Sequence, residues 1–154
     1  MGILDISTRM KPRIRELTAE HYGSIRAIFT DEFYSKGDIP YSYLQEAWRY
    51  RARNMSLGAF NNEGDLVGFI ITYDHYIAFI AVQSYFQNMS IGTMLLKNVL
   101  NKCILENHYV YLWPLSLDKR LVNWYRSHGF NATHDGHMVF HTYNTRMHSK
   151  HLTI

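Results

Sequence analysis

The chain has 154 residues, of which 47% are hydrophobic and 15% aromatic, enough for one core and too few for two ordinary domains. Its formal net charge of +3 gives a mildly basic surface that suits an anionic ligand, and its one cysteine excludes an intrachain disulfide and a cysteine-based metal site. We therefore expect a single domain over residues 1–154, with an ordered core over about 12–145 and a frayed C-terminal tail.

No segment suited to export or to a membrane stands out in the sequence. Residues 1–11 lack the long apolar stretch of a signal peptide, and no run reaches the roughly 18 apolar residues that a membrane helix needs. A lone cysteine also fits a reducing compartment. The sequence predicts a soluble, cytoplasmic protein with no membrane partner.

The first half of the chain changes from helical to strand periodicity at Ser56. Before that point, apolar residues recur at helical spacing, and after it Val, Ile and Phe gather in short runs that are separated by turn residues. The elements expected, in order, are a strand at 12–17, a helix after Thr18, a second helix at 43–53, and antiparallel strands at 57–60, 66–73 and 76–82. A hairpin meander follows two helices in this half.

The second half of the chain predicts a strand, a helix and a further strand that follow a long helix. The elements expected are a helix at 93–105 with a broad apolar face, a strand at 109–115, a helix at 118–127 that stops at Gly129, and a last strand at 138–143. Strand, helix and strand in succession form a βαβ unit. The whole pattern predicts an α+β fold, with a mixed central β-sheet flanked by about four helices.

A strand that runs through a tight loop into a helix is the most informative stretch. The apolar run Ile80-Ala81-Val82 leads into a polar loop, and a helix begins near Gly92. The first N–H groups of a helix lack intrahelical partners and align with the helix dipole, which suits a pyrophosphate. Gly92 permits close approach of a ligand to the backbone. A purely structural turn is the alternative interpretation.

The loop itself carries a recognisable motif. The stretch Gln87-Asn88-Met89-Ser90-Ile91-Gly92 resembles the cofactor signature of the GNAT superfamily of acetyl-CoA-dependent N-acetyltransferases, which is Gln or Arg, two residues, Gly, one residue, and Gly or Ala. Gln87 and Gly92 match, while Ser90 stands where the first glycine is usual. A serine fits such a loop provided that the backbone there does not require a positive φ.

A second stretch is similar to the same family. Tyr125, Gly129 and Phe130 match the ending of the family's late helix, which is Tyr, three residues, Gly and Phe. The resemblance implies that Tyr125 lies near the coenzyme sulfur and returns a proton to the leaving thiolate. A half-buried packing residue is the alternative for Tyr125.

The resemblance covers roughly residues 13–143 and implies a GNAT-like fold, with acetyl-CoA as co-substrate and no metal. It further implies direct acetyl transfer to a primary amine, which could be a polyamine, a small amine, or a protein lysine or N-terminus. Backbone N–H groups near Ala81 and Val82 would hold the pantetheine arm and face the thioester oxygen. The cofactor-binding residues implied are Ile80, Ala81, Val82, Gln87, Asn88, Met89, Ser90, Ile91, Gly92, Thr93 and Asn123.

The general base is less well defined by the sequence. An amine with a pKa near 10 must lose a proton before it attacks. Tyr76 stands where the histone-acetylating branch carries a catalytic glutamate. Asp74, expected two residues earlier on the same strand face, and the adjacent His75 could each act through water. Solvated residues at a strand start are the alternative.

The residues expected to bind the acceptor are Asp31 and Glu32, at the end of the first helix, together with Tyr76 and Trp113. Carboxylates there would suit a cationic polyamine or a lysine side chain, and a solvated helix end is the alternative.

Two other residue types could carry chemistry. His137 and His141, with His134 nearby, share a strand face at a spacing too wide for an easy metal site. Cys103 lies on the apolar face of a predicted helix, so we expect it in the core.

Two further hypotheses stay open. The first is a non-catalytic GNAT-like module that binds CoA or a protein partner, motivated by Ser90 and Tyr76. The second is a nucleic-acid-binding domain that would use Arg49, Arg51 and Arg53 on the second helix, although these cations are too few to make nucleic acid the favoured partner. A homodimer is a further expectation that rests on the resemblance.

Overall fold

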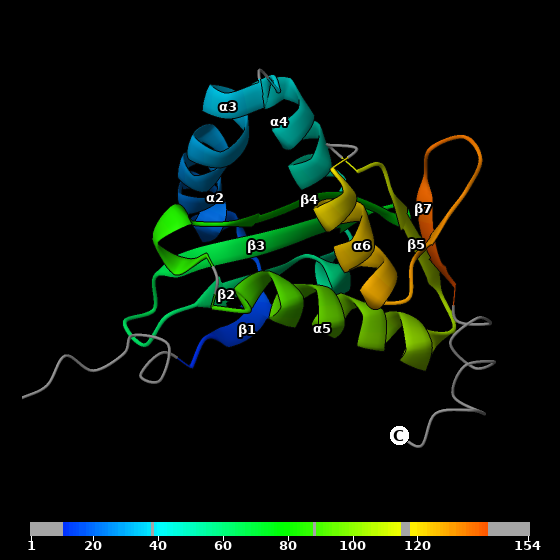
Figure 1. The fold of residues 1–154 in the computed structure, drawn as a ribbon. Coiled ribbons are helices and arrows are strands. Elements are labelled where there is room, and N and C mark those ends of the chain that lie inside the picture. Colours follow the sequence, from blue (N-terminus) through cyan, green and yellow to red (C-terminus); the bar gives the residue numbers. More distant parts are fainter. Residues whose placement is uncertain (1–10, 38, 88, 115–117, 142–154) are drawn as a thin grey trace, which may run out of the picture.

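The computed structural model describes residues 11–37, 39–87, 89–114 and 118–141, and these form a seven-stranded mixed sheet with helices on both faces (Figure 1). The predicted α+β class is confirmed. The strands are β1 (Arg13–Glu16), β2 (Leu57–Phe60), β3 (Leu66–Tyr73), β4 (Tyr76–Val82), β5 (Tyr109–Leu112), β6 (Asn131–Ala132) and β7 (Met138–His141). The helices are α2 (Tyr22–Phe29), α3 (Ser35–Gly37), α4 (Tyr41–Arg49), α5 (Ile91–Glu106) and α6 (Lys119–Ser127).

Short turns of other helical types connect these elements. A π-helical turn, η2 (Thr30–Tyr34), continues α2, and three 3-10 turns are η1 (Ala19–His21), η3 (Arg53–Met55) and η4 (Ser84–Phe86). The expected frayed tail, the ends of the strands predicted at 109–115 and 138–143, and Asn88 lie outside the described residues.

The strand order is β1-β2-β3-β4-β5-β7-β6. The first four strands pair antiparallel, β4 and β5 pair parallel, and β7 pairs antiparallel with both β5 and β6. The parallel pair is the one that a helical crossover must join, because a hairpin can only connect antiparallel strands. Helix α5 provides that crossover between β4 and β5.

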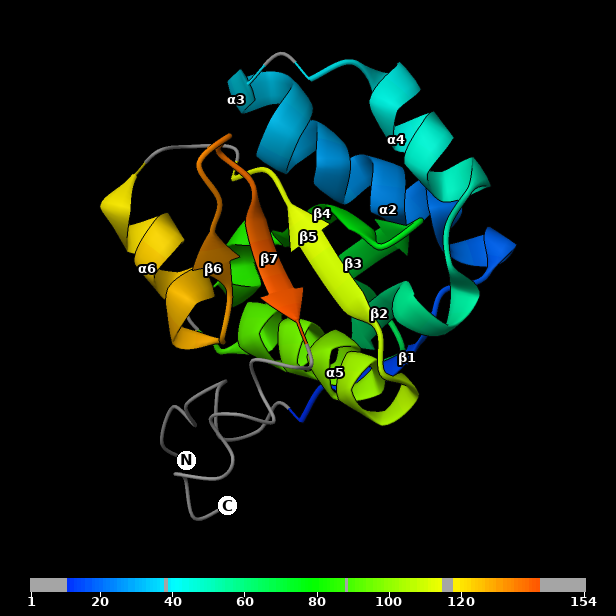
Figure 2. The same cartoon turned by 90° about the vertical axis from the view of Figure 1, so that its right-hand side faces the viewer.

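Two core clusters sandwich the sheet, with α2 and α4 on one face and α5 and α6 on the other (Figures 1 and 2). Helix α2 buries Ile25, Ile28 and Phe29 at helical spacing against the first face. Helix α5 buries Leu95, Leu96, Val99, Leu100 and Cys103 against the second. Strand β3 is covered on both sides, so it is an almost continuous apolar run without alternation.

The second helix is shorter than the sequence predicts. Helix α4 ends at Arg49, whereas the expected helix reached residue 53. The N–H of Ala52 donates to the carbonyl of Thr72 at 2.7 Å, so the chain pairs with the end of β3 and leaves the helix. Arg51 Nη1 donates to the Trp48 carbonyl at 2.9 Å, with the guanidinium 3.7 Å from the Trp48 ring centre. The three arginines therefore do not share one helix, as the nucleic-acid hypothesis had assumed.

A β-bulge changes the direction of side chains along β4. The register steps from Ile71 opposite Phe79 to Thr72 opposite Ile77, which leaves Ala78 as the extra residue. In a regular strand, residues two apart share a face, yet Ile77 packs on the α5 side and Phe79 on the α2 side. The bulge thus turns β4 over at its middle, as bulges beside functional sites often do.

Strands β4 and β5 separate almost as soon as they meet. Their register contains one pair, Tyr76 with Tyr111, and the Tyr111 N–H donates to the His75 carbonyl at 2.8 Å. Beyond this pair, the edge of β4 that faces β5 has no strand partner over residues 77–82 among the described residues. Its outward N–H and C=O groups face the gap between the two strands. The sheet therefore opens at its centre beside the bulge.

The fold makes a direct prediction about stability. Leu95 is fully buried on α5 and Leu105, on the same helix, is 84% exposed. We expect Leu95→Ala to lower the free energy of unfolding by about 2–5 kcal/mol, because it leaves a cavity in the core. The matched Leu105→Ala change should alter the same quantity by less than about 0.5 kcal/mol. Urea unfolding followed by circular dichroism measures both, and equal losses would contradict this packing of α5.

Candidate active site

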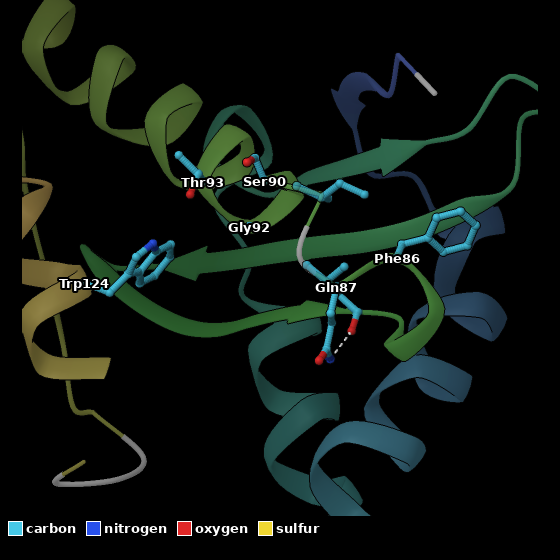
Figure 3. A pocket seen from close by; sticks show the side chains of 8 residues that line it. Phe86, Gln87, Ser90, Gly92, Thr93 and Trp124 are labelled. Carbon is cyan, nitrogen blue, oxygen red and sulfur yellow. Dashed lines mark hydrogen bonds between the residues drawn. The ribbon is translucent and has the colours of Figure 1, made fainter. Parts of the chain in front are cut away.

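Three neighbouring pockets lie along β4. The first, which we call the loop pocket, has a volume of about 290 Å³ and lies where β4 ends and α5 begins (Figure 3). Ser90, Gly92 and Thr93 come from the start of α5, and Trp124 is contributed by α6. Its lining residues are Val82, Phe86, Gln87, Ser90, Ile91, Gly92, Thr93 and Trp124.

The loop pocket is built to receive an anion through the backbone. The first N–H to bond at the start of α5 is that of Met94, which donates to the Ser90 carbonyl at 3.0 Å. The N–H groups of residues 91–93 have no acceptor within the helix and add to the positive end of its dipole. None of the described residues that line this pocket carries a positive charge. Attraction of an anion therefore depends on the backbone and the helix dipole.

Ser90 adopts the conformation that the sequence analysis named as unfavourable for a serine. Its φ is +60° and its ψ is +19°, in the left-handed region, and its side chain makes no capping hydrogen bond. A non-glycine residue there costs about 1 kcal/mol. The glycine that is usual at this position thus has a physical basis. Gly92 differs, since a Cβ there would meet only Val82 at an ordinary 3.8 Å, and packing within the protein does not require a glycine.

Gln87 is engaged with the protein itself. Its Nε2 donates to Glu32 Oε1 at 2.8 Å and to the Val82 carbonyl at 2.9 Å. Ser84 Oγ also donates to Glu32, at 2.8 Å, and Lys36 Nζ lies 3.4 Å from the same carboxylate. The Glu32 side chain is only 10% exposed. This network ties the π-helical turn η2 to the loop that precedes α5.

The network corrects one sequence expectation. Glu32 was expected on the wall of the acceptor site, but its carboxylate faces the loop before α5 because Ser84 and Gln87 hold it there. Asp31, its neighbour in η2, is exposed and lines none of the three pockets.

The second pocket, which we call the gap pocket, occupies the opening between β4 and β5. Its volume is about 230 Å³, and it extends from the bulge to α6. The residues that line it are Phe33, Ile77, Ala78, Phe79, Ile80, Leu112, Trp113, Leu121 and Tyr125. Among the described residues of its lining, only Tyr125 has an ionisable side chain. Burial, and after it the nearby Tyr76, raises the pKa of Tyr125 to about 12, so the phenol keeps its proton at neutral pH.

The motif at the end of α6 fixes the position of Tyr125. Gly129 has a φ of +98°, and its N–H donates to the Arg126 carbonyl as the helix ends. A glycine adopts this conformation without strain. The chain then turns back, so that the buried Phe130 packs against the Tyr125 ring with centres 5.5 Å apart. The spacing of Tyr, three residues, Gly and Phe therefore places Phe130 where it holds the Tyr125 ring in position.

The third pocket lies between α4 and β4, and we call it the α4–β4 pocket. Its volume is about 320 Å³, and its lining is Ile39, Tyr43, Glu46, Ala47, Tyr73, Tyr76, Ala78 and Phe79. It shares Ala78 and Phe79 with the gap pocket. The two cavities therefore meet at the bulge of β4. Burial, and next to it the neighbouring Tyr73, raises the pKa of Tyr76, so this phenol is also protonated.

The two candidate bases do not reach these pockets. Strand β3 ends at Tyr73 and β4 begins at Tyr76, so the expectation that Asp74 shares a strand face with Tyr76 is wrong. Asp74 and His75 form the two-residue turn, with φ values of +49° and +67°. His75 Nδ1 lies 2.8 Å from the Tyr109 carbonyl, and its ring stacks on that of Tyr109 with centres 4.3 Å apart. Asp74 is exposed.

The other predicted residues divide between lining and packing positions. Val82, Ser90, Ile91, Gly92 and Thr93 line the loop pocket, while Ile80 and Trp113 line the gap pocket.

Three predicted residues lie elsewhere. Ala81 is buried on the α2 side, Met89 packs on the α5 core, and Asn123 is exposed on α6. Trp124, next to Asn123, takes the lining position instead.

Pocket residues that the sequence did not indicate include Phe33, Glu46, Tyr73 and Leu121. Helical spacing was the only available signal for Glu46, since it lies on the same face of α4 as Tyr43 and Ala47.

Two further observations concern the described residues only. They contain no group of three or more His, Cys, Asp or Glu side chains that could hold a metal ion, and His137 is bonded to Asp135 with 2.9 Å between Nδ1 and Oδ1. Within the same ranges, no helix is long and apolar enough to cross a membrane. Cys103 is buried in the core as expected, and burial raises the pKa of its thiol to about 12.

Fold and sequence together place the protein in a family. The chain belongs to the acetyltransferase (GNAT) family, whose model matches residues 22–130. That match spans α2 to α6 and includes the described lining residues of all three pockets. No curated protein sequence matches the chain.

Solved structures share the fold at low sequence identity. A GNAT-family acetyltransferase of Staphylococcus aureus superposes with a TM-score of 0.72 at 16% identity, covering 86% of this chain and 99% of that one. The ribosomal-protein-S18-alanine N-acetyltransferase of Escherichia coli gives 0.70 at 19%, covering 86% and 94%. Naa50 of Arabidopsis thaliana, solved with the bisubstrate analogue CoA-Ac-MVNAL, gives 0.66 at 20%, covering 79% and 84%.

The left-handed Ser90 makes a testable prediction. We expect Ser90→Gly to raise the free energy of unfolding by about 1 kcal/mol, because glycine adopts this conformation without strain. Ser24→Gly, at an exposed position in α2, is the matched control and should lower the same quantity by roughly 0.5 kcal/mol. Urea denaturation of both variants measures the difference. A loss of stability in Ser90→Gly would show that the loop does not hold this conformation in solution.

Proposed function

We propose that this protein is an acetyl-CoA-dependent N-acetyltransferase that transfers an acetyl group directly to a primary amine. The observation that carries the proposal is the opening between β4 and β5, along which the loop pocket, the gap pocket and the α4–β4 pocket lie in succession beside β4. Acetyl transfer from a nucleotide-linked thioester needs an anion site for the pyrophosphate, a channel for the pantetheine arm, and access for the second substrate. The three pockets follow that order along β4.

The loop pocket would hold the pyrophosphate of acetyl-CoA. Residues 91–93 would donate their N–H groups to it, and Gly92, which packing does not require, would let the phosphate approach the backbone. Gln87 and Glu32 would act by fixing the loop, since their polar atoms already bond to each other. The pantetheine arm would pair with the open edge of β4 near Val82. One N–H there would polarise the thioester carbonyl.

Tyr125 is proposed as the acid of the reaction. The neutral amine attacks the thioester carbon, a C–N bond forms, and the C–S bond breaks. The thiolate takes a proton from the Tyr125 phenol, and the proton released by the acylated nitrogen returns to the phenolate through solvent. The high pKa of Tyr125 suits a proton donor and excludes a base at neutral pH. Cys103 is not available as an acetyl carrier, since it is buried and its thiol is protonated.

The base that deprotonates the amine is proposed to act through water. Asp74 and His75 lie in the turn between Tyr73 and Tyr76, and both of these tyrosines line the α4–β4 pocket. Either residue would therefore need a chain of waters past the tyrosine side chains. Asp31 lies outside the three linings, so its proposed contact with the acceptor would require a substrate that extends beyond them.

A non-catalytic GNAT-like module that binds CoA or a protein partner is the second candidate. Ser90 motivates it, because a serine with a left-handed backbone stands where the family usually has glycine. Isothermal titration with acetyl-CoA, followed by thiol release with polyamines, amino acids and lysine peptides, separates the two. Binding with turnover supports the transferase, and binding without turnover for every amine supports a CoA-binding module. Absence of binding contradicts the transferase and leaves only a module that binds a protein partner.

Tyr125→Phe tests the proposed acid. We expect kcat to fall by a factor on the order of 10²–10⁴, the usual contribution of a positioned acid, with acetyl-CoA affinity unchanged because the ring still packs on Phe130. Tyr50→Phe, at a tyrosine that is 57% exposed on the far end of α4, is the control and should leave kcat unaltered. An unchanged kcat in Tyr125→Phe would reduce this residue to a packing role.

The pH profile gives an independent test of the same residue. A raised pKa means that the phenol keeps its proton as the pH increases, and an ordinary tyrosine would lose it near pH 10. We expect kcat/KM to rise with pH while the amine deprotonates, with no decline below about pH 10. A decline that begins near pH 8 would point to a different proton donor.

A further inference from the structure

Among the described residues that line the α4–β4 pocket, only Glu46 carries a formal charge. The rest of this lining is apolar or aromatic, and three of its rings belong to Tyr43, Tyr73 and Tyr76. Glu46 lies on α4 three residues after Tyr43, so both project from the same helical face. Its charge acts on Tyr73, whose pKa is raised by burial first and by Glu46 second. Glu46 is exposed to solvent and lines the cavity together with Tyr73 of β3 and Tyr76 of β4.

Glu46 has no other assignment in the described structure. Within the described ranges its carboxylate takes part in no ion pair and accepts no side-chain hydrogen bond. Glu32 is the contrasting case, since Ser84, Gln87 and Lys36 hold it. A carboxylate that lines an aromatic pocket and lacks an internal partner is suited to a cation from outside. Tyrosine faces add to the attraction through cation–π contact.

The reacting amine itself is poorly matched to this carboxylate. It must be neutral when it attacks the thioester, whereas a nearby carboxylate favours the charged form of an amine. Binding to Glu46 therefore helps catalysis when the carboxylate contacts a second ammonium of the same molecule, which stays protonated while the reacting amine is neutral. The bulge at Ala78, where the α4–β4 and gap pockets meet, separates the two positions.

We propose that the α4–β4 pocket binds a second, non-reacting cation of the acceptor between Glu46 and the rings of Tyr43, Tyr73 and Tyr76. The acceptor is then an amine that carries another ammonium a few carbons away. This chemistry occurs in aliphatic diamines and polyamines, and also in a peptide whose first residue is lysine. The inference rests on the proposed acetyl transfer and specifies its substrate class.

Matched acceptors test this inference. We would measure thiol release with 1,5-diaminopentane and with pentylamine, which has the same chain and one cation, for the wild type, Glu46→Gln and the control Glu63→Gln. Glu63 is exposed in the turn between β2 and β3. We expect the diamine to exceed the monoamine in kcat/KM by about tenfold in the wild type and in the control. Glu46→Gln should remove that preference through KM, leaving kcat and the monoamine unchanged.

A second pair of acceptors distinguishes the two sources of this chemistry. Peptides that begin with lysine and with leucine are compared in the same assay. A lysine preference larger than the diamine preference, and lost in Glu46→Gln, would identify the acceptor as a basic peptide.

Other results would overturn the inference. Equal kcat/KM values for diamine and monoamine would do so. A fall in kcat for both acceptors in Glu46→Gln would make Glu46 the base. If acetyl-CoA binds and no amine reacts, acetyl transfer fails as the function. Isothermal titration of the two amines then tests cation binding in the pocket independently of acetyl transfer. Diamine affinity that Glu46→Gln does not lower would reject the cation site.

Discussion

The separation of β4 from β5 after a single residue pair is the constraint on which the rest of this structure depends. A sheet gains stability from continuous hydrogen bonding, and an open central edge leaves backbone groups without partners. Here the edge of β4 opens beside a bulge at Ala78, so that side chains on either half of the strand face opposite layers. The gap and the bulge together let one strand serve pockets on both faces of the sheet.

The surrounding elements maintain that opening and supply the groups that line it. Helix α5 places free N–H groups at one end, and α6 clamps Tyr125 into the gap through its contact with Phe130. The network of Glu32, Ser84 and Gln87 joins η2 to the loop before α5, and η2 also carries Phe33, which lines the gap. π-helical turns of this kind are common at functional sites.

Periodicity predicted most of the elements, because local patterns determine them. The strands at 66–73 and 76–82 and the helix at 118–127 agree with the structure to within a residue. Both motifs now have a physical basis, which is the left-handed Ser90 for the loop before α5 and the positive φ of Gly129 for the end of α6. Asp74 and His75 were misread because a two-residue gap between apolar runs is itself a turn signal. Asp and His tolerate a positive φ there.

Residues that depend on long-range packing could not be found in this way. Glu46 becomes notable only when α4 is known to cover the end of β4, and Glu32 only when the loop before α5 is known to reach it. The bulge at Ala78 has no local signature among small and apolar neighbours. Strand register sets it, and register is fixed by pairing between distant segments.

Amide hydrogen exchange with and without acetyl-CoA tests whether the opening between β4 and β5 holds the cofactor. We predict slower exchange of the amides at 91–93 and of the open edge of β4 near Val82 when acetyl-CoA is bound, with little change in β1 and β2. Protection confined to other surfaces, or no protection at saturating acetyl-CoA, would contradict the claim that the opening between β4 and β5 is the cofactor site.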